Sequence, residues 1–128
     1  MQLHPLQELA RELCRVFLGW RLREDYDALL VLGEGSLHVD LRSGEAWCDR
    51  EPIPPLFIAG ELRGRLARGL EGAGLAEQEL AEASLEAEFA ARPKRGRPGR
   101  ALALACRVRL VGSAGVFAAE ANNAAAGV

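Results

Sequence analysis

The chain has 128 residues, of which 49% are hydrophobic and 27% are charged, and its formal net charge at pH 7 is −2. This composition is typical of one globular domain and excludes an intrinsically disordered chain. The small net charge also excludes a protein that binds nucleic acid over its whole surface.

The first expected element is an amphipathic helix from Pro5 to Gly19. Its apolar residues are spaced three and four apart, which gathers them on one helical face. Pro5 suits the first turn, where its missing N–H has no partner to lose. This face is expected to pack on a sheet. Its members are Leu6, Leu9, Leu13, Val16 and Phe17.

Three strands are expected in the next part of the chain. The apolar run 26–32 is followed by two glycines and is typical of a strand buried on both faces. Apolar and polar residues then alternate over 37–41 and 45–49, the pattern of half-buried strands. We expect the strands over 37–41 and 45–49 to pair with each other as a hairpin.

Ser43-Gly44 occupies the place of a two-residue hairpin turn, which predicts that His38 lies opposite Asp49. With Asp40 beside it, that arrangement is one in which a carboxylate orients an imidazole for acid–base chemistry. The alternative is that these side chains are the ordinary charges of a solvated sheet face. No nucleophile is placed beside them by the pattern, so we expect no enzyme here.

A second helix is expected from Leu56 to Glu71, after three prolines that are expected to end the preceding sheet. Leucine or isoleucine recurs every four residues along it. Its three glycines each weaken a helix by up to about 1 kcal/mol relative to Ala. They predict a close backbone approach to the sheet or to a partner. The apolar residues are Ile58, Leu62, Leu66 and Leu70, and the glycines are Gly60, Gly64 and Gly69.

A long hairpin is expected over 81–111. Odd positions from Ala81 to Ala91 are apolar and even positions carry mainly Glu, which is the alternation of a strand. The composition of 75–91, rich in Ala, Glu and Leu, favours a helix instead. A helix there would place Leu75 on one face with several acidic residues, so the strand is the better prediction. A second alternating run begins near Leu102. In paired strands, Glu86 or Glu88 is expected near Arg107.

These elements predict an α+β fold with the order α-β-β-β-α-β-β. A mostly antiparallel sheet of about five strands would carry two helices on one face. The domain is expected over 1–121. Val116-Phe117 adds a turn or a strand extension, and 122–128 is expected to be a frayed tail.

The three cysteines, Cys14, Cys48 and Cys106, have none of the close spacings of a metal site. We expect buried reduced thiols in a cytoplasmic protein. No metal or other cofactor is expected. The sequence shows neither a leader nor an apolar run of spanning length, so we expect no signal peptide and no membrane contact.

The loop between the two hairpin strands contains Arg95-Gly96-Arg97-Pro98 among further basic residues. This segment resembles the AT-hook, in which two arginines lie in the narrow minor groove of A·T-rich DNA and glycine lets the backbone approach. The resemblance implies a DNA-binding role. The alternative is a solvated hairpin tip. The residues of this candidate site are Arg92, Lys94, Arg95, Gly96, Arg97, Pro98 and Arg100.

The predicted order of elements is similar to that of type III secretion chaperones. Members of that family are small acidic homodimers that bind an extended segment of a partner, so the resemblance implies a protein-binding module. From the residues, we expect a non-catalytic interaction protein that binds a protein or itself. We expect a homodimer that forms through apolar residues of the second helix or a sheet face. Minor-groove binding through 92–100 is the alternative function.

Overall fold

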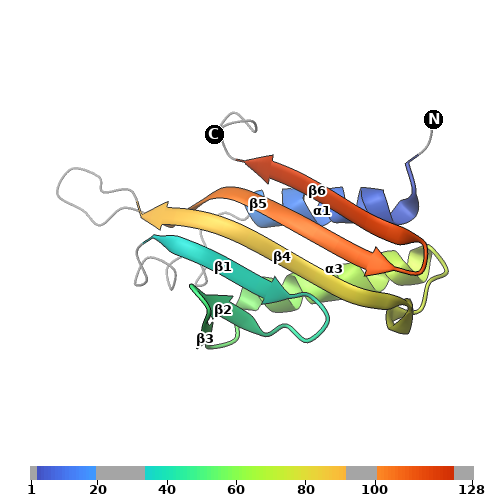
Figure 1. Ribbon diagram of the computed structural model, residues 1–128, viewed down its shortest axis with the longest axis horizontal. Helices are drawn as coiled ribbons and strands as arrows, with labels where there is room; N and C mark the ends of the chain where they lie inside the picture. Colours follow the sequence, from blue (N-terminus) through green and yellow to red (C-terminus); the bar gives the residue numbers. More distant parts are fainter. Residues whose placement is uncertain (1–2, 20–33, 92–100, 123–128) are drawn as a thin grey trace.

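The fold is built on one antiparallel sheet of six strands, and two helices lie against the same face of it (Figure 1). The computed structural model describes residues 3–19, 34–91 and 101–122. The strand order across the sheet is β3-β2-β1-β4-β5-β6. The expected α+β class is therefore confirmed. In chain order the elements are α1 (Pro5–Leu18), β1 (Gly35–Asp40), β2 (Ala46–Cys48), β3 (Glu51–Ile53), α3 (Phe57–Gly72), the short 3-10 helix η1 (Glu77–Glu79), β4 (Leu80–Ala91), β5 (Ala101–Gly112) and β6 (Gly115–Asn122).

Helix α1 forms as expected because its sequence supplies both a start signal and an apolar face. The backbone N–H of Leu6 donates to His4 Nδ1 at 3.1 Å, which caps the first turn, and Pro5 occupies the first position. The apolar face packs beneath β5 and β6. Its buried residues are Leu6, Leu9, Ala10, Leu13, Cys14 and Phe17.

Helix α3 buries the four residues that recur at every fourth position, as expected. Of its glycines, Gly69 makes a close approach, but to helix α1 rather than to the sheet or a partner as expected. A Cβ at this position would lie 2.5 Å from Leu9 Cδ1, so the glycine lets α1 and α3 pack side by side. A Cβ at Gly60 would meet nothing within 4 Å, and one at Gly64 would meet only the Arg68 side chain. Neither glycine therefore approaches the sheet closely, and an approach to a partner stays a prediction for both.

Strands β4 and β5 form the predicted long hairpin, and the helical alternative for 75–91 is excluded. The alternation decides the outcome because each strand buries one face against the helices. Leu85 and Val108 are opposite each other and fully buried, whereas their neighbours Glu86 and Arg107 are opposite each other on the exposed face. The expected pairing of Glu86 with Arg107 is confirmed.

The sheet has six strands rather than about five, so the order of elements is α-β-β-β-α-β-β-β. The run 26–32 lies outside the described residues. Strand β3 contains Pro52, which was expected to end the sheet; an edge strand tolerates proline because one side needs no ladder partner. Strand β6 pairs with β5 along its whole length and continues through Asn122, one residue beyond the predicted domain end.

The hairpin between β1 and β2 has a longer loop than Ser43-Gly44. His38 lies opposite Trp47, not Asp49, so the predicted register is wrong by two residues. The reason is the side chain of Asp40. Its Oδ1 accepts hydrogen bonds from the backbone N–H groups of Arg42 and Ser43 at 2.8 and 3.1 Å, which closes a turn over 41–44. A shift of two residues leaves every side chain on its predicted face.

One cluster of buried hydrophobic residues fills the space between the helices and the inner face of the sheet. It includes side chains from both helices and from strands β1, β2, β4, β5 and β6. No helix among the described residues is long and apolar enough to cross a lipid bilayer.

Candidate functional site

The face of the sheet opposite the helices carries a continuous row of side chains across five strands. The register pairs Trp47 of β2 with His38 of β1, His38 with Glu86 of β4, Glu86 with Arg107 of β5, and Arg107 with Glu120 of β6. Directly opposite residues on one face lie close enough to interact. The row is therefore a line of neighbouring side chains at right angles to the strands.

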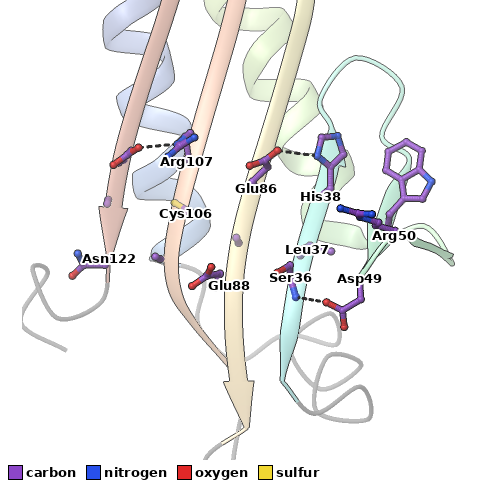
Figure 2. A pocket seen from close by; sticks show the side chains of 15 residues that line it. Ser36, Leu37, His38, Asp49, Arg50, Glu86, Glu88, Cys106, Arg107 and Asn122 are labelled. Carbon is purple, nitrogen blue, oxygen red and sulfur yellow. Dashed lines mark hydrogen bonds and ion pairs between the residues drawn. The ribbon is translucent and has the colours of Figure 1, made fainter.

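One ion pair, one imidazole–carboxylate contact and one ring contact connect members of this row. His38 Nδ1 lies 3.6 Å from Glu86 Oε1, and Arg107 Nε donates to Glu120 Oε1 at 2.7 Å (Figure 2). The imidazole of His38 also lies 5.4 Å from the Trp47 ring, centre to centre, in a tilted arrangement. These side chains are roughly half exposed, so solvent screens their charges and each pair stabilises the fold little. Their main effect is to orient one another.

The row crosses a broad open hollow of about 1120 Å³ on this face. Side chains and backbone of β1, β2, β4, β5 and β6 line it, together with the turn between β2 and β3 (Figure 2). The lining carries four carboxylates and two guanidinium groups, which is an excess of two negative charges with His38 neutral. The carboxylates belong to Asp49, Glu86, Glu88 and Glu120, and the guanidinium groups to Arg50 and Arg107.

The turn at the rim of the hollow has a strained backbone. Asp49 and Arg50 have φ values of 49° and 72°, a region that L-residues other than Asn and Asp rarely adopt. Asp49 is fixed on Ser36 by two hydrogen bonds: its N–H donates to Ser36 O at 2.8 Å, and its Oδ1 accepts from Ser36 N at 2.9 Å. A Cβ at Gly35 would lie 2.6 Å from Asp49 Oδ2, so the carboxylate needs a glycine beneath it.

The three cysteines are buried and are free thiols, and Cys106 is also one of the residues that line the hollow. Cys14 Sγ donates to Ala119 O at 3.3 Å, and Cys106 Sγ lies 3.8 Å from Cys14 O. The hydrogen bond between the two thiols, together with burial, raises the pKa of Cys106, and the same bond lowers the pKa of Cys14. Burial and the nearby Asp49 carboxylate raise the pKa of Cys48. The described residues contain no cluster suited to a metal ion.

The imidazole arrangement suggested by the sequence does not form. His38 faces Glu86 and Trp47, whereas Asp49 binds Ser36 and Asp40 closes the β1–β2 turn. The three residues are therefore not brought together for acid–base chemistry.

The candidate DNA-binding residues 92–100 lie outside the described residues. The hollow was not identified from the sequence, although its alternating polar residues were placed on the outer face. Trp47 was the available signal, because a large aromatic side chain on a solvated face is unusual.

Comparison with models of protein families, with curated proteins and with solved structures finds no match to this chain. The resemblances to the AT-hook and to type III secretion chaperones are thus left as hypotheses that rest on the sequence.

Proposed function

We propose that this protein is a non-catalytic binding module whose outer sheet face receives an extended, basic segment of a partner protein. The observation that carries the proposal is the hollow of about 1120 Å³ with its excess of carboxylates. An elongated, open surface of this kind suits a peptide segment better than a small molecule, which proteins usually enclose.

The dimensions of the row fit such a segment. Five neighbouring strands at a spacing of about 4.8 Å place Trp47 and Glu120 roughly 19 Å apart. An extended chain covers that distance with about six residues at 3.3 Å each. A partner segment lying across the strands could therefore contact the whole row.

The charges favour a basic partner. Arg107 is paired with Glu120, so its positive charge is opposed within the row. Glu86 contacts the imidazole of His38, which leaves its negative charge uncompensated when His38 is neutral. Glu88 points into the hollow and is exposed, and no partner for its carboxylate is found among the described residues (Figure 2). An Arg or Lys of the partner would pair with this carboxylate. The indole of Trp47 would contact an apolar or cationic neighbour.

Selection from a displayed library of ten-residue peptides tests the proposal. We expect enrichment of segments with Arg or Lys beside an apolar residue. Binding of the selected peptide, followed by fluorescence anisotropy, should weaken at least about tenfold in Glu88→Lys because like charges then face each other.

Glu71→Lys is the matched control. It makes the same change of charge at an exposed position of α3, on the opposite side of the molecule, and should leave the affinity unchanged. Equal affinity for the wild type and Glu88→Lys, or a library that yields no basic segment, would contradict the proposal.

Minor-groove binding through 92–100 is the second candidate, and the observation that favours it is the Arg95-Gly96-Arg97-Pro98 core. The strands that precede and follow this segment, β4 and β5, pair as an antiparallel hairpin, so the segment connects the two strands of that hairpin. Mobility shifts of A·T-rich and G·C-rich duplexes provide the test. If DNA binds in this way, replacing Arg95 and Arg97 by Ala abolishes the preference for A·T-rich duplex.

Replacing Arg92 and Arg100 by Ala should instead weaken binding to both duplexes. The affinity should also fall with salt, with a slope near 0.9 per phosphate neutralised. Equal binding of the two duplexes by the wild type would remove this candidate.

A further inference from the structure

We propose that the exposed edge of β6 is a dimerisation surface, on which the β6 strand of a second copy of this chain adds in antiparallel orientation. The proposal is independent of the partner segment on the sheet face, because it concerns backbone groups at one edge of the sheet. It also names a surface for the homodimer that the sequence led us to expect.

The two edges of the sheet differ in how well they resist strand addition. The β3 edge has three residues, and the central one is Pro52, which has no N–H to offer. The β6 edge has eight residues from Gly115 to Asn122, with no proline, no lysine and Glu120 as the only charge. Natural proteins protect long edges with proline, lysine or other charges. An edge that lacks them, and that no other strand of the described residues pairs with, indicates a partner strand.

The hairpin geometry decides which groups β6 offers. A two-residue turn, Ser113-Ala114, joins the strands, so the flanking pair Gly112 and Gly115 exchange hydrogen bonds. The N–H and C=O groups of successive residues point to opposite sides of a strand. Those of Val116, Ala118 and Glu120 therefore point away from β5. In agreement, Ala118 O accepts a hydrogen bond at 2.7 Å from Gln7 Nε2 of α1 rather than from β5. A carbonyl has a second lone pair for a further donor.

The strand is self-complementary when Ala118 lies on a two-fold axis. Ala118 then pairs with Ala118 of the second copy, and Val116 pairs with Glu120, which uses the outward groups of both strands. The overlap covers nearly all of β6, because Ala118 lies near its middle. A register centred on Glu120 would instead place two carboxylates opposite each other, which is unfavourable. The two-fold pairing closes after two copies and gives a dimer.

The side chains at this edge agree with such a contact. Val116 is 56% exposed, one of the few large hydrophobic residues with this exposure among the described residues. Ala118 is exposed and small, so two copies can approach at the axis without a clash. In the paired register Val116 would lie beside the aliphatic part of Glu120 of the second copy.

Sedimentation equilibrium of the purified full chain tests the proposal first. We expect a mass of twice 13.8 kDa for the wild type. We expect the mass of one chain for Ala118→Pro, since proline removes an outward N–H and leaves the β5–β6 bonds intact. Glu71→Lys, at an exposed position of α3 rather than on this edge, is the control and should remain dimeric. A wild-type mass of 13.8 kDa at every concentration would overturn the proposal.

Cross-linking of a folded variant tests the register, even if Ala118→Pro does not fold. In the Ala118→Cys dimer, the Cα atoms of the two new cysteines lie about 5.5 Å apart, a separation that a disulfide accommodates. Glutathione disulfide should oxidise them to one intermolecular disulfide and be reduced to two glutathione molecules. Val116→Cys should not cross-link, because its partner position is Glu120. A dimer in which Ala118→Cys fails to cross-link would show a different interface and overturn the proposal.

Discussion

The two faces of the sheet use adjacent residues of the same strands for opposite purposes. On the inner face Val39, Leu85 and Val108 lie side by side, and each is 0% exposed. The adjacent residues in the chain, His38 and Glu86, point to the outer face and belong to the charged row there. The inner row is held by burial of apolar surface, whereas the outer row is held by screened charge pairs.

This difference separates stability from recognition. Complete burial of a Leu or Val side chain contributes about 1.5–3 kcal/mol, whereas an exposed ion pair contributes about 0.2–1 kcal/mol. The inner face therefore decides whether the sheet forms. Substitutions on the outer face therefore cost little stability. Under the proposed function, the charges and the indole found there would select the bound segment.

The largest effect is expected from a substitution on the inner face. Leu85→Ala should lower the free energy of unfolding by about 2–5 kcal/mol, because it leaves a cavity in the middle of the core. Urea denaturation measures the change. Glu86→Ala, the next residue on the outer face, should change it by no more than about 0.5 kcal/mol. Similar losses in the two variants would contradict the separation of the two faces.

The comparison extends to α3, which has a buried and a solvent-facing side. Gly69→Ala should lower the free energy of unfolding by about 1–3 kcal/mol, since its Cβ would overlap the buried side chain of Leu9. Gly60→Ala should raise it by up to about 1 kcal/mol, because Ala favours a helix and meets open space there. Thermal unfolding of both variants measures the difference. Changes of the same sign would mean that α1 and α3 are not closely packed at Gly69.

The rim of the outer hollow offers a substitution that should increase stability. Arg50 has a φ of 72°, which an L-residue adopts at a cost of about 1–2 kcal/mol, so Arg50→Gly should raise the free energy of unfolding by about 1 kcal/mol. Arg50→Ala removes the same guanidinium but keeps the strain and should bring no gain. If both variants were equally stabilised, charge rather than backbone strain would be the cause.

The smallest effect is on the pH dependence of the free energy of unfolding, through the buried thiol of Cys48. Burial and Asp49 raise the pKa of Cys48 above its ordinary value of 9.0. The folded protein then holds this proton while the unfolded chain releases it, so the free energy of unfolding falls as the pH rises above 9.0. Cys48→Ala should show a weaker fall over the same range. Denaturation curves at several alkaline pH values check this, and identical slopes would contradict it.

Much of the fold was predictable because its elements follow the two simplest periodicities. The apolar spacing in α1 and α3 and the alternation in β4 and β5 each predicted the element and its buried face. The predictions were incomplete at the two edges of the sheet: β3 was not expected, and β6 was expected only as a turn or a strand extension. Pro52 lies within a strand because that strand is at an edge, and the position of an edge depends on strand order, which no local pattern contains.

The candidate site was less predictable than the fold. The pattern placed His38 on the outer face but paired it with Asp49, because the loop length was judged from Ser43-Gly44 alone. The hydrogen bonds from the 41–44 loop to the side chain of Asp40 lengthened the turn and gave His38 a different neighbour. Recognition surfaces depend on such pairings, so an error of two residues changes the chemistry while leaving every face correct.

The sequence by itself determined which side of each element faces the core, because the free energy of burying apolar side chains acts through local spacing. Only the tertiary structure decided which strands are neighbours. That neighbourhood brings Trp47, His38 and Glu86 into one row, places Gly69 against Leu9, and makes β6 an edge strand of the described sheet. The physical reason is that contacts between residues distant in the chain depend on the packing of all elements at once, whereas periodicity records only whether a residue is buried.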